Sequence, residues 1–201
     1  RDPRLEGSLL YPGQSFIDDD YILLPFNSAT ANNDRIGVQK STATGYWIRK
    51  YLDPRDRQSR KGTLDFMIIR YSEVLLSYVE SLIELGDWKN PAVVQYLNEV
   101  RTRAGMPEVD QQRYNSAETL RKLVRRERQS ELAFEGQRYL DIRRWGIAPQ
   151  VMNGTVTGAT NPETGNAVKV QDRVYTDRDY LWPIPEKETL SNPDMVQNPG
   201  Y

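Results

Sequence analysis

The sequence of 201 residues contains neither histidine nor cysteine. The absence of histidine excludes Ser-His-Asp and Cys-His catalysis, imidazole acid–base chemistry and zinc sites built on histidine. The absence of cysteine excludes disulfides, thiol nucleophiles and cysteine-ligated metal clusters. Any enzymatic chemistry would therefore depend on carboxylates, lysine, arginine, tyrosine, serine or threonine.

The chain also lacks an excess of charge of one sign and a long hydrophobic run. Its 27 basic and 28 acidic side chains leave a formal net charge of −1, which does not favour binding to nucleic acid or to an anionic membrane. Its longest apolar runs, such as residues 66–69, are far shorter than the roughly 18 residues of a membrane-spanning helix. The chain begins at Arg1 without a targeting segment, so we expect a mature product or part of a longer protein.

The pattern of apolar residues divides the chain into three segments. Residues 1–69 are irregular and rich in aromatic residues, with short strand-like runs at 21–24, 46–51 and 64–69 and a polar loop at 54–62. Residues 70–146 carry a helical period. Residues 147–201 lose that period, and we expect an extended C-terminal segment without regular elements, with a turn signal at Asn153-Gly154 and a loop at 160–165.

The middle segment predicts four helices. A stripe from Val74 to Ile83 indicates a first helix that ends near Gly86, and Asn90-Pro91 begins a second that ends at Gly105. A third helix is predicted from Ser116 to about residue 136 and a fourth over residues 137–145. The two pairs resemble tetratricopeptide units, of which at least three are normally needed for stability, so the pattern predicts further packing partners.

Three glutamates, Glu127, Glu131 and Glu135, are spaced four apart and share one helix face. Paired carboxylates serve glycosidases and di-metal centres, but the bundle di-metal pattern requires histidine. Glu127 and Glu131 continue the apolar stripe of the third helix, which directs them to the helix interface. We therefore predict a structural ion-pair network, with arginines 128, 138, 143 and 144 as partners of these glutamates. Its members are Glu127, Arg128, Glu131, Glu135, Arg138, Asp141 and Arg144.

Aromatic residues beside turns in the first segment are the candidate ligand-binding residues. Exposed rings can stack on the C–H faces of sugars, while amides and carboxylates bind the hydroxyl groups. The candidates are Tyr21, Phe26, Asn27, Asn32, Asp34 and Trp47. A second small core under long loops is the open alternative. The acidic clusters match no calcium-loop pattern, so we predict no metal site and no cofactor.

Several motifs resemble the C-terminal part of the SusD/RagB family. They are RYSEVLL at 70–76, NEVRTRAG at 98–105, the long segment ERQSELAFEGQRYLDIRRW at 127–145, LWPIP at 181–185 and QNPGY at 197–201. The opening Asp2-Pro3-Arg4 is similar to the family as well, and the motifs occur in the family's order along essentially the whole chain.

The resemblance implies a mainly α-helical fold with tetratricopeptide-like helix pairs, irregular loop-rich segments and a few short strands. It implies one truncated SusD-like domain whose N-terminal part, signal peptide and lipid-bearing cysteine are absent from this chain. Members of the family are lipoproteins on the outer face of the Bacteroidetes outer membrane, where they capture glycans or other nutrients for a SusC-type TonB-dependent transporter. The resemblance implies no catalytic role for the Glu/Arg motif.

Two other functions stay open at this point. A stand-alone helical-repeat module would bind a protein partner between its helix pairs. A carboxylate-based hydrolase would consume an oligosaccharide and would lose turnover on mutation of Glu127 or Glu131 to glutamine.

Overall fold

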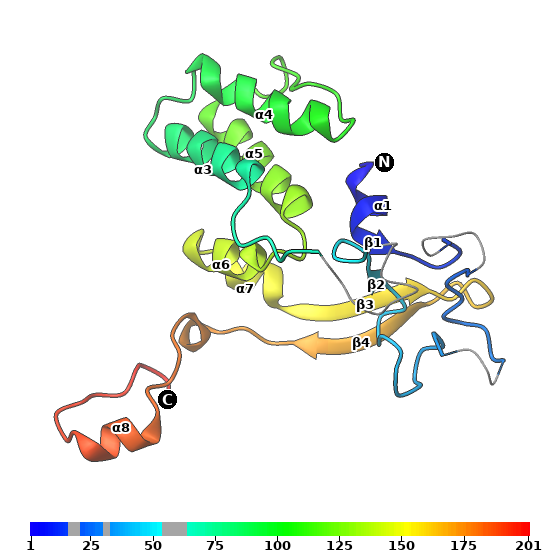
Figure 1. Cartoon of the computed structure of the whole chain (residues 1–201). Coiled ribbons are helices and arrows are strands. Elements are labelled where there is room, and N and C mark those ends of the chain that lie inside the picture. The colour runs from blue at the N-terminus through cyan, green and yellow to red at the C-terminus, as the bar shows by residue number, and fades with distance from the viewer. Residues whose placement is uncertain (16–20, 30–32, 54–63) are drawn as a thin grey trace. The chain divides into compact units, whose positions relative to one another are not determined.

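The structure is a computed structural model that describes residues 1–15, 21–29, 33–53 and 64–201 (Figure 1). Two compact units divide the chain, Arg1–Arg138 and Tyr139–Tyr201. Helices predominate and the strands are few and short, which confirms the expected fold class. Among the described residues, no helix combines the length and the apolar character needed to span a bilayer.

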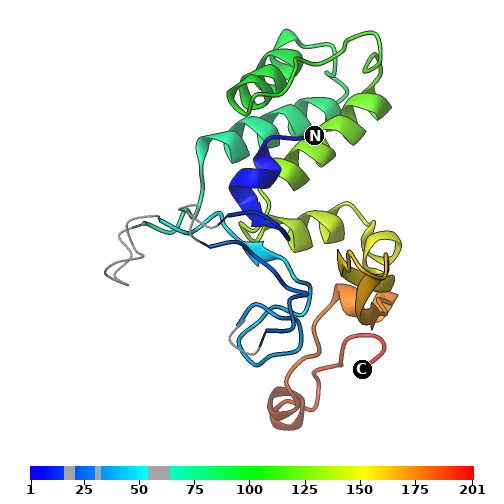
Figure 2. The ribbon, with the colours of Figure 1, turned by 90° about the vertical axis from the view of Figure 1, so that its right-hand side faces the viewer.

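Three helices form the core of the first unit: α3 (Tyr71–Glu84), α4 (Pro91–Arg103) and α5 (Ala117–Glu131). Helix α3 contacts both of the others, and the two views in Figures 1 and 2 agree that the three lie side by side. The buried cluster between them contains Leu75, Leu76, Val79, Ile83, Val93, Leu97, Val100, Val109, Leu120, Leu123 and Val124. It includes Leu75, Val79 and Ile83 of the predicted stripe, whereas Val74 and Tyr78 of that stripe are exposed.

The helix boundaries follow from local chemistry. Gly86 follows α3 with a φ of +85°, a left-handed conformation that favours glycine. The side chain of Asn90 accepts the Ala92 backbone N–H at 3.1 Å and so caps α4. Ser116 and Thr119 bond each other's backbone N–H groups and form a capping box at the start of α5. These positions confirm the predicted helix starts.

The end of the third helix differs from the prediction. Helix α5 stops at Glu131, and α6 (Gln137–Arg144) begins after an irregular turn. Within that turn Phe134 has a φ of +65°, which a continuous helix does not permit. The phenol of Tyr51 donates to the Phe134 carbonyl oxygen at 3.0 Å and holds this turn from outside the helix.

The irregular N-terminal segment contains α1 (Arg4–Ser8), β1 (Leu9–Leu10) and β2 (Trp47–Ile48). The two strands pair antiparallel, and Ile22 forms an isolated bridge with Ser15. The strand predicted at 64–69 is wrong: these residues form no described ladder and several of their apolar side chains are exposed, because no described strand lies alongside to pair with them. The loop predicted at 54–62 lies outside the described residues.

The second unit corrects the expectation of an extended segment over residues 147–201. It contains α7 (Ala148–Met152), β3 (Gly154–Thr160), β4 (Ala167–Arg173), the short 3-10 helix η1 (Asp177–Tyr180) and α8 (Glu186–Ser191). Strands β3 and β4 pair antiparallel with two irregularities in register. The unit also contains a small core of Ile142, Ala148 and Tyr175.

The hairpin turn is not at the Asn153-Gly154 signal. Gly154 is the first residue of β3, and the Asn153 amide instead donates to the Tyr175 carbonyl oxygen at 3.0 Å. The turn lies in the predicted loop, where the Gly165 N–H donates to the Asn161 carbonyl oxygen at 2.9 Å. The Asn153-Gly154 pair therefore lies at the start of β3 and does not form the hairpin turn.

Candidate functional site

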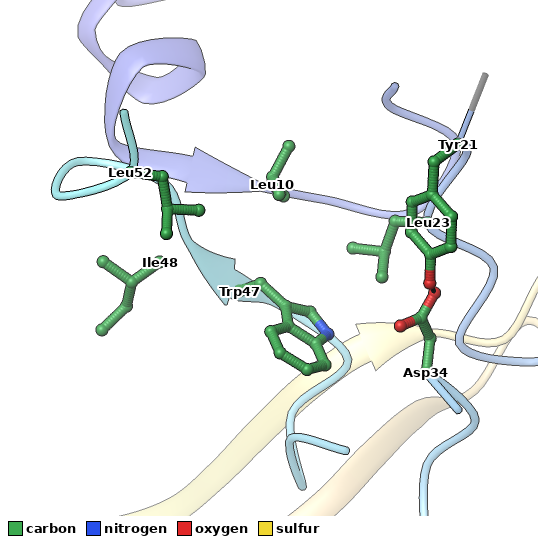
Figure 3. Close-up of a pocket in the computed structure, with 7 residues that line it drawn as sticks. All are labelled: Leu10, Tyr21, Leu23, Asp34, Trp47, Ile48 and Leu52. Carbon is green, nitrogen blue, oxygen red and sulfur yellow. Dashed lines mark hydrogen bonds between the residues drawn. The ribbon is translucent and has the colours of Figure 1, made fainter. Parts of the chain in front are cut away.

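A cavity of about 450 Å³ lies in the loop-rich part of the first unit (Figure 3). Strands β1 and β2 supply three of the lining residues: Leu10 lies opposite Trp47 in their register, and Ile48 follows Trp47 in β2. The described residues that line the cavity are Leu10, Tyr21, Leu23, Asp34, Trp47, Ile48 and Leu52.

Backbone hydrogen bonds bring the remaining walls to these strands. The Gly13 N–H donates to the Leu23 carbonyl oxygen at 2.9 Å, and the Leu23 N–H donates to Gln14 at 3.0 Å. The Ile36 N–H donates to the Pro25 carbonyl oxygen at 3.0 Å, and this bond fixes the turn that contains Asp34. The cavity is thus held by main-chain bonds that tie separate loop segments together.

Tyr21 and Asp34 form a polar pair at one end of the cavity. Tyr21 donates its phenolic O–H to the buried carboxylate of Asp34. Burial is the largest cause that raises the pKa of Tyr21 to about 12, and the hydrogen bond to Asp34 and the charge of Asp34 contribute the rest of that rise. Tyr21 therefore stays protonated and acts as a donor, while Asp34 presents negative charge to the cavity.

The other walls are apolar. Leu10 and Leu23 are buried, whereas Ile48 and Leu52 are exposed at the opposite end from Tyr21 (Figure 3). The indole Nε1 of Trp47 is buried, and no described residue accepts its hydrogen. A buried donor without an acceptor is rare in folded proteins, so this atom is an unusual feature of the cavity.

The structure brings together three of the six predicted ligand residues: Tyr21, Asp34 and Trp47 line the same cavity. Phe26 and Asn27 do not line it, and the Asn27 side chain instead accepts the N–H of Ala29 at 2.9 Å. Asn32 lies outside the described residues. Whether these residues bind a ligand stays a prediction.

Sequence reasoning missed the aliphatic walls of the cavity. The predicted ligand residues are aromatic, amide and carboxylate residues, whereas the other described lining residues are Leu10, Leu23, Ile48 and Leu52. Short alternating apolar runs near these positions were the available signal, but the pairing of distant loops that unites them has no local pattern.

The glutamates of α5 belong to a second polar cluster in the same unit. Glu127 accepts from Arg4 at 2.9 Å and also pairs with Arg101. Arg128 lies 3.6 Å from the Glu80 carboxylate and donates to the Ser77 hydroxyl at 3.0 Å. These buried charges are paired, as buried charges must be.

Glu131 is the centre of this cluster, and its side chain is only 2% exposed. Its carboxylate pairs with Arg70 at 2.6 Å, with Arg103 at 2.5 Å and with Arg4 at 3.3 Å. Burial raises the pKa of Glu131, but the hydrogen bond and charge of Arg70, with the other arginines, outweigh it and hold the pKa below its ordinary value. The carboxylate is therefore ionised, and both of its oxygen atoms are paired with arginines.

Glu135 and the second unit complete the predicted network residues. Glu135 pairs with Lys50 at 2.5 Å and with Arg70 at 2.7 Å. Asp141 pairs with Arg144 at 2.8 Å within the second unit. Arg138 is half-buried in α6.

The glutamates have partners beyond those expected. The predicted partners, arginines 128, 138, 143 and 144, all lie within one stretch of chain. Glu127 and Glu131 also pair with Arg4, Arg70, Arg101 and Arg103, most of which come from distant segments. Helical spacing alone does not indicate these partners, because the helix interface faces other elements. Within the described ranges, no group of three or more acidic residues is arranged to hold a metal ion.

These features define a mainly helical protein that carries a ligand-sized cavity in its loops and uses its helix carboxylates in ion pairs. The chain belongs to the SusD family, whose sequence model matches residues 1–201. A SusD-like protein, P2, from Formosa agariphila is 30% identical over an alignment that covers 76% of this chain and 29% of that protein.

Solved structures agree with this assignment. A SusD-like carbohydrate-binding protein from Bacteroides fragilis is 32% identical, with a TM-score of 0.78 over 96% of this chain and 41% of its own. Surface glycan-binding protein A from Bacteroides uniformis is 25% identical, with a TM-score of 0.58 over 98% of this chain and 37% of its own. The chain therefore spans well under half the length of these relatives.

Proposed function

We propose that this protein captures glycans non-covalently and that the cavity of Tyr21, Asp34 and Trp47 is its binding site. The observation that carries the proposal is the convergence of two aromatic rings and a carboxylate on one cavity of about 450 Å³. This volume lies within the range of small-molecule sites. The relatives from B. fragilis and B. uniformis that are described as carbohydrate-binding and glycan-binding support the ligand class.

The binding mechanism follows from the lining. The rings of Tyr21 and Trp47 offer apolar faces to the C–H groups of a sugar, and Asp34 accepts hydrogen bonds from it. Affinity is expected to be weak to moderate, because an open site removes little ligand surface from water.

We propose no catalytic step. The carboxylates of α5 that could have served as a catalytic pair are engaged by guanidinium groups, as Glu131 shows. A general acid must be able to hold and release a proton near the working pH, whereas the lowered pKa of Glu131 keeps it ionised. An oligosaccharide incubated with the protein should be recovered intact.

The place of this protein in the cell is a proposal from its family. We infer that it belongs to a surface lipoprotein of an outer membrane, which delivers its ligand to a SusC-type TonB-dependent transporter. Co-purification with such a transporter from detergent-solubilised outer membranes would test the partnership, and its absence under conditions that preserve other outer-membrane complexes would count against it.

Glycan retention tests the site. Trp47→Ala and Tyr21→Ala should lose retention on an array of immobilised glycans and keep their circular dichroism spectrum. Trp182→Ala is the matched control, because Trp182 is 72% exposed in the second unit and does not line the cavity. Unchanged retention in Trp47→Ala would remove the cavity as the binding site.

A helical-repeat interaction module is the second candidate. Tyr71, Val74 and Tyr78 form an exposed apolar stripe on α3, and stripes of this kind bind other helices. A module of this type would retain no glycan, and Val74→Asp would abolish its capture of a protein partner.

A further inference from the structure

The cavity is more apolar than a sugar with only hydroxyl substituents requires. Of the seven described residues that line it, four are aliphatic: Leu10, Leu23, Ile48 and Leu52. Hydroxyl groups placed against such a wall would lose their hydrogen bonds to water without compensation. The part of the ligand that enters the cavity should therefore carry an apolar group.

The buried indole nitrogen of Trp47 adds a second requirement. Indole Nε1–H is only a donor, and no described residue accepts from it. Pairing with Leu10 across the two short strands fixes the backbone from which the ring projects. Figure 3 shows the nitrogen edge of the ring on the side of Asp34. The ligand should therefore bring a hydrogen-bond acceptor to this edge.

The carboxylate of Asp34 adds a third requirement. It lines the cavity and accepts the Tyr21 hydroxyl, and a carboxylate with about four acceptor positions can accept an N–H or O–H of a ligand beside its existing partners. Its negative charge disfavours a carboxylate or sulfate in the same cavity. The ligand group should therefore combine a neutral acceptor, a donor and an apolar part.

We infer that the cavity recognises the N-acetyl group of an amino sugar. The acetamido carbonyl accepts from Trp47, its N–H donates to Asp34, and its methyl group packs against Leu10 and Leu23. A hydroxyl group in the same position lacks the methyl group, and an unsubstituted amine lacks the acceptor. This inference rests on the proposed function and specifies the substrate class of the same site.

The test compares two ligands that share their linkage and length. Binding of an N-acetylated chito-oligosaccharide is measured by calorimetry against the corresponding cello-oligosaccharide, which has a hydroxyl in place of each acetamido group. The acetylated ligand should bind about tenfold more tightly or better, a difference of about 1.4 kcal/mol. Saturation-transfer NMR on the unmodified protein should give its strongest signal at the acetyl methyl protons.

The variant Trp47→Phe removes the N–H donor and keeps an aromatic ring. It should lose most of the preference for the acetylated ligand while its weaker affinity for the cello-oligosaccharide stays, and Trp182→Phe should change neither. Full preference in Trp47→Phe would overturn the inference. If that variant does not fold, the methyl signal in NMR decides the question, and a weak methyl signal overturns it.

The proposed function can survive the failure of this inference. Equal affinity for the two ligands, or no binding of either, overturns acetyl recognition. The proposed function is decided separately by array retention, because loss of any glycan signal in Trp47→Ala supports it whatever the sugar.

Discussion

Glu131 receives three guanidinium groups in a position that is almost fully buried. Such a carboxylate contributes to stability only because its partners are in place, since an uncompensated buried charge is costly. The same holds in reverse for the arginines, which would be left without an acceptor if the glutamate lost its charge.

Glu131→Gln should therefore be strongly destabilising. We expect the free energy of unfolding to fall by about 3–5 kcal/mol, because a buried ion-pair partner is removed and buried cations remain. Urea denaturation measures the change. Glu118→Gln is the matched control, because its pair with Lys122 is exposed and its loss should cause no measurable change. Equal effects of the two substitutions would contradict a buried network.

The phenol of Tyr21 should titrate late. Its pKa of about 12, against an ordinary value of 10.0, is caused first by burial and then by the Asp34 carboxylate. The raised pKa stabilises the folded state below pH about 10, and this contribution is lost as the pH rises through about 12. Ultraviolet titrations of the unmodified protein and of Tyr21→Phe are compared, and the difference between the two curves gives the titration of the Tyr21 phenol. A midpoint near pH 10 in that difference would contradict the hydrogen bond to Asp34.

At the scale of elements, the helix starts were predictable and the α5 end was not. Ser116 and Asn90 act on their own helices within a few residues, so local sequence contains the whole cause. The α5 end depends on Phe134 in a left-handed conformation and on Tyr51, which reaches it from far along the chain. The strand predicted at 64–69 fails for a related reason, because a strand exists only where a partner strand pairs with it.

Ser116→Ala should weaken the start of α5. We expect a loss of about 1 kcal/mol in the free energy of unfolding, because the capping hydroxyl bonds the Thr119 N–H. Ser81→Ala is the control: the same substitution inside α3 should be neutral or slightly stabilising, since alanine is the better helix former. Chemical denaturation of the two variants gives the comparison, and similar losses in both would argue against a capping role.

At the scale of the whole molecule, ion pairs connect segments that are far apart in sequence. Arg4 reaches Glu127 across 123 residues, and Arg70 reaches Glu131 across 61. Helical spacing predicted that these glutamates face an interface, but it contains no information on which distant cations arrive there. For the same reason, the candidate residues could be named from sequence, whereas the cavity that unites three of them could not.

The ion pairs of Glu131 should make the free energy of unfolding sensitive to acidic pH. Because the pKa of Glu131 is lowered in the folded state, its contribution is complete above its ordinary value of 4.5 and is lost as the pH falls through the folded value. The free energy of unfolding should therefore drop as the pH falls below about 4.5, and Glu131→Gln should show a shallower drop. Urea denaturation at several pH values measures both slopes, and identical slopes would show that other groups cause the acid sensitivity.

Lys50 connects the strand beside the cavity to the end of α5. It lies two positions after Ile48, and its ammonium group donates to the carbonyl oxygens of Glu131 and Ala133 at 2.9 and 3.0 Å. The strand that forms a wall of the cavity is thereby fastened to the end of α5. Mass action then makes occupancy of the cavity a stabiliser of the helical bundle: a ligand at about one hundred times its dissociation constant adds about 2.7 kcal/mol. The melting temperature of the unmodified protein thus becomes a label-free reporter for screening sugars against it.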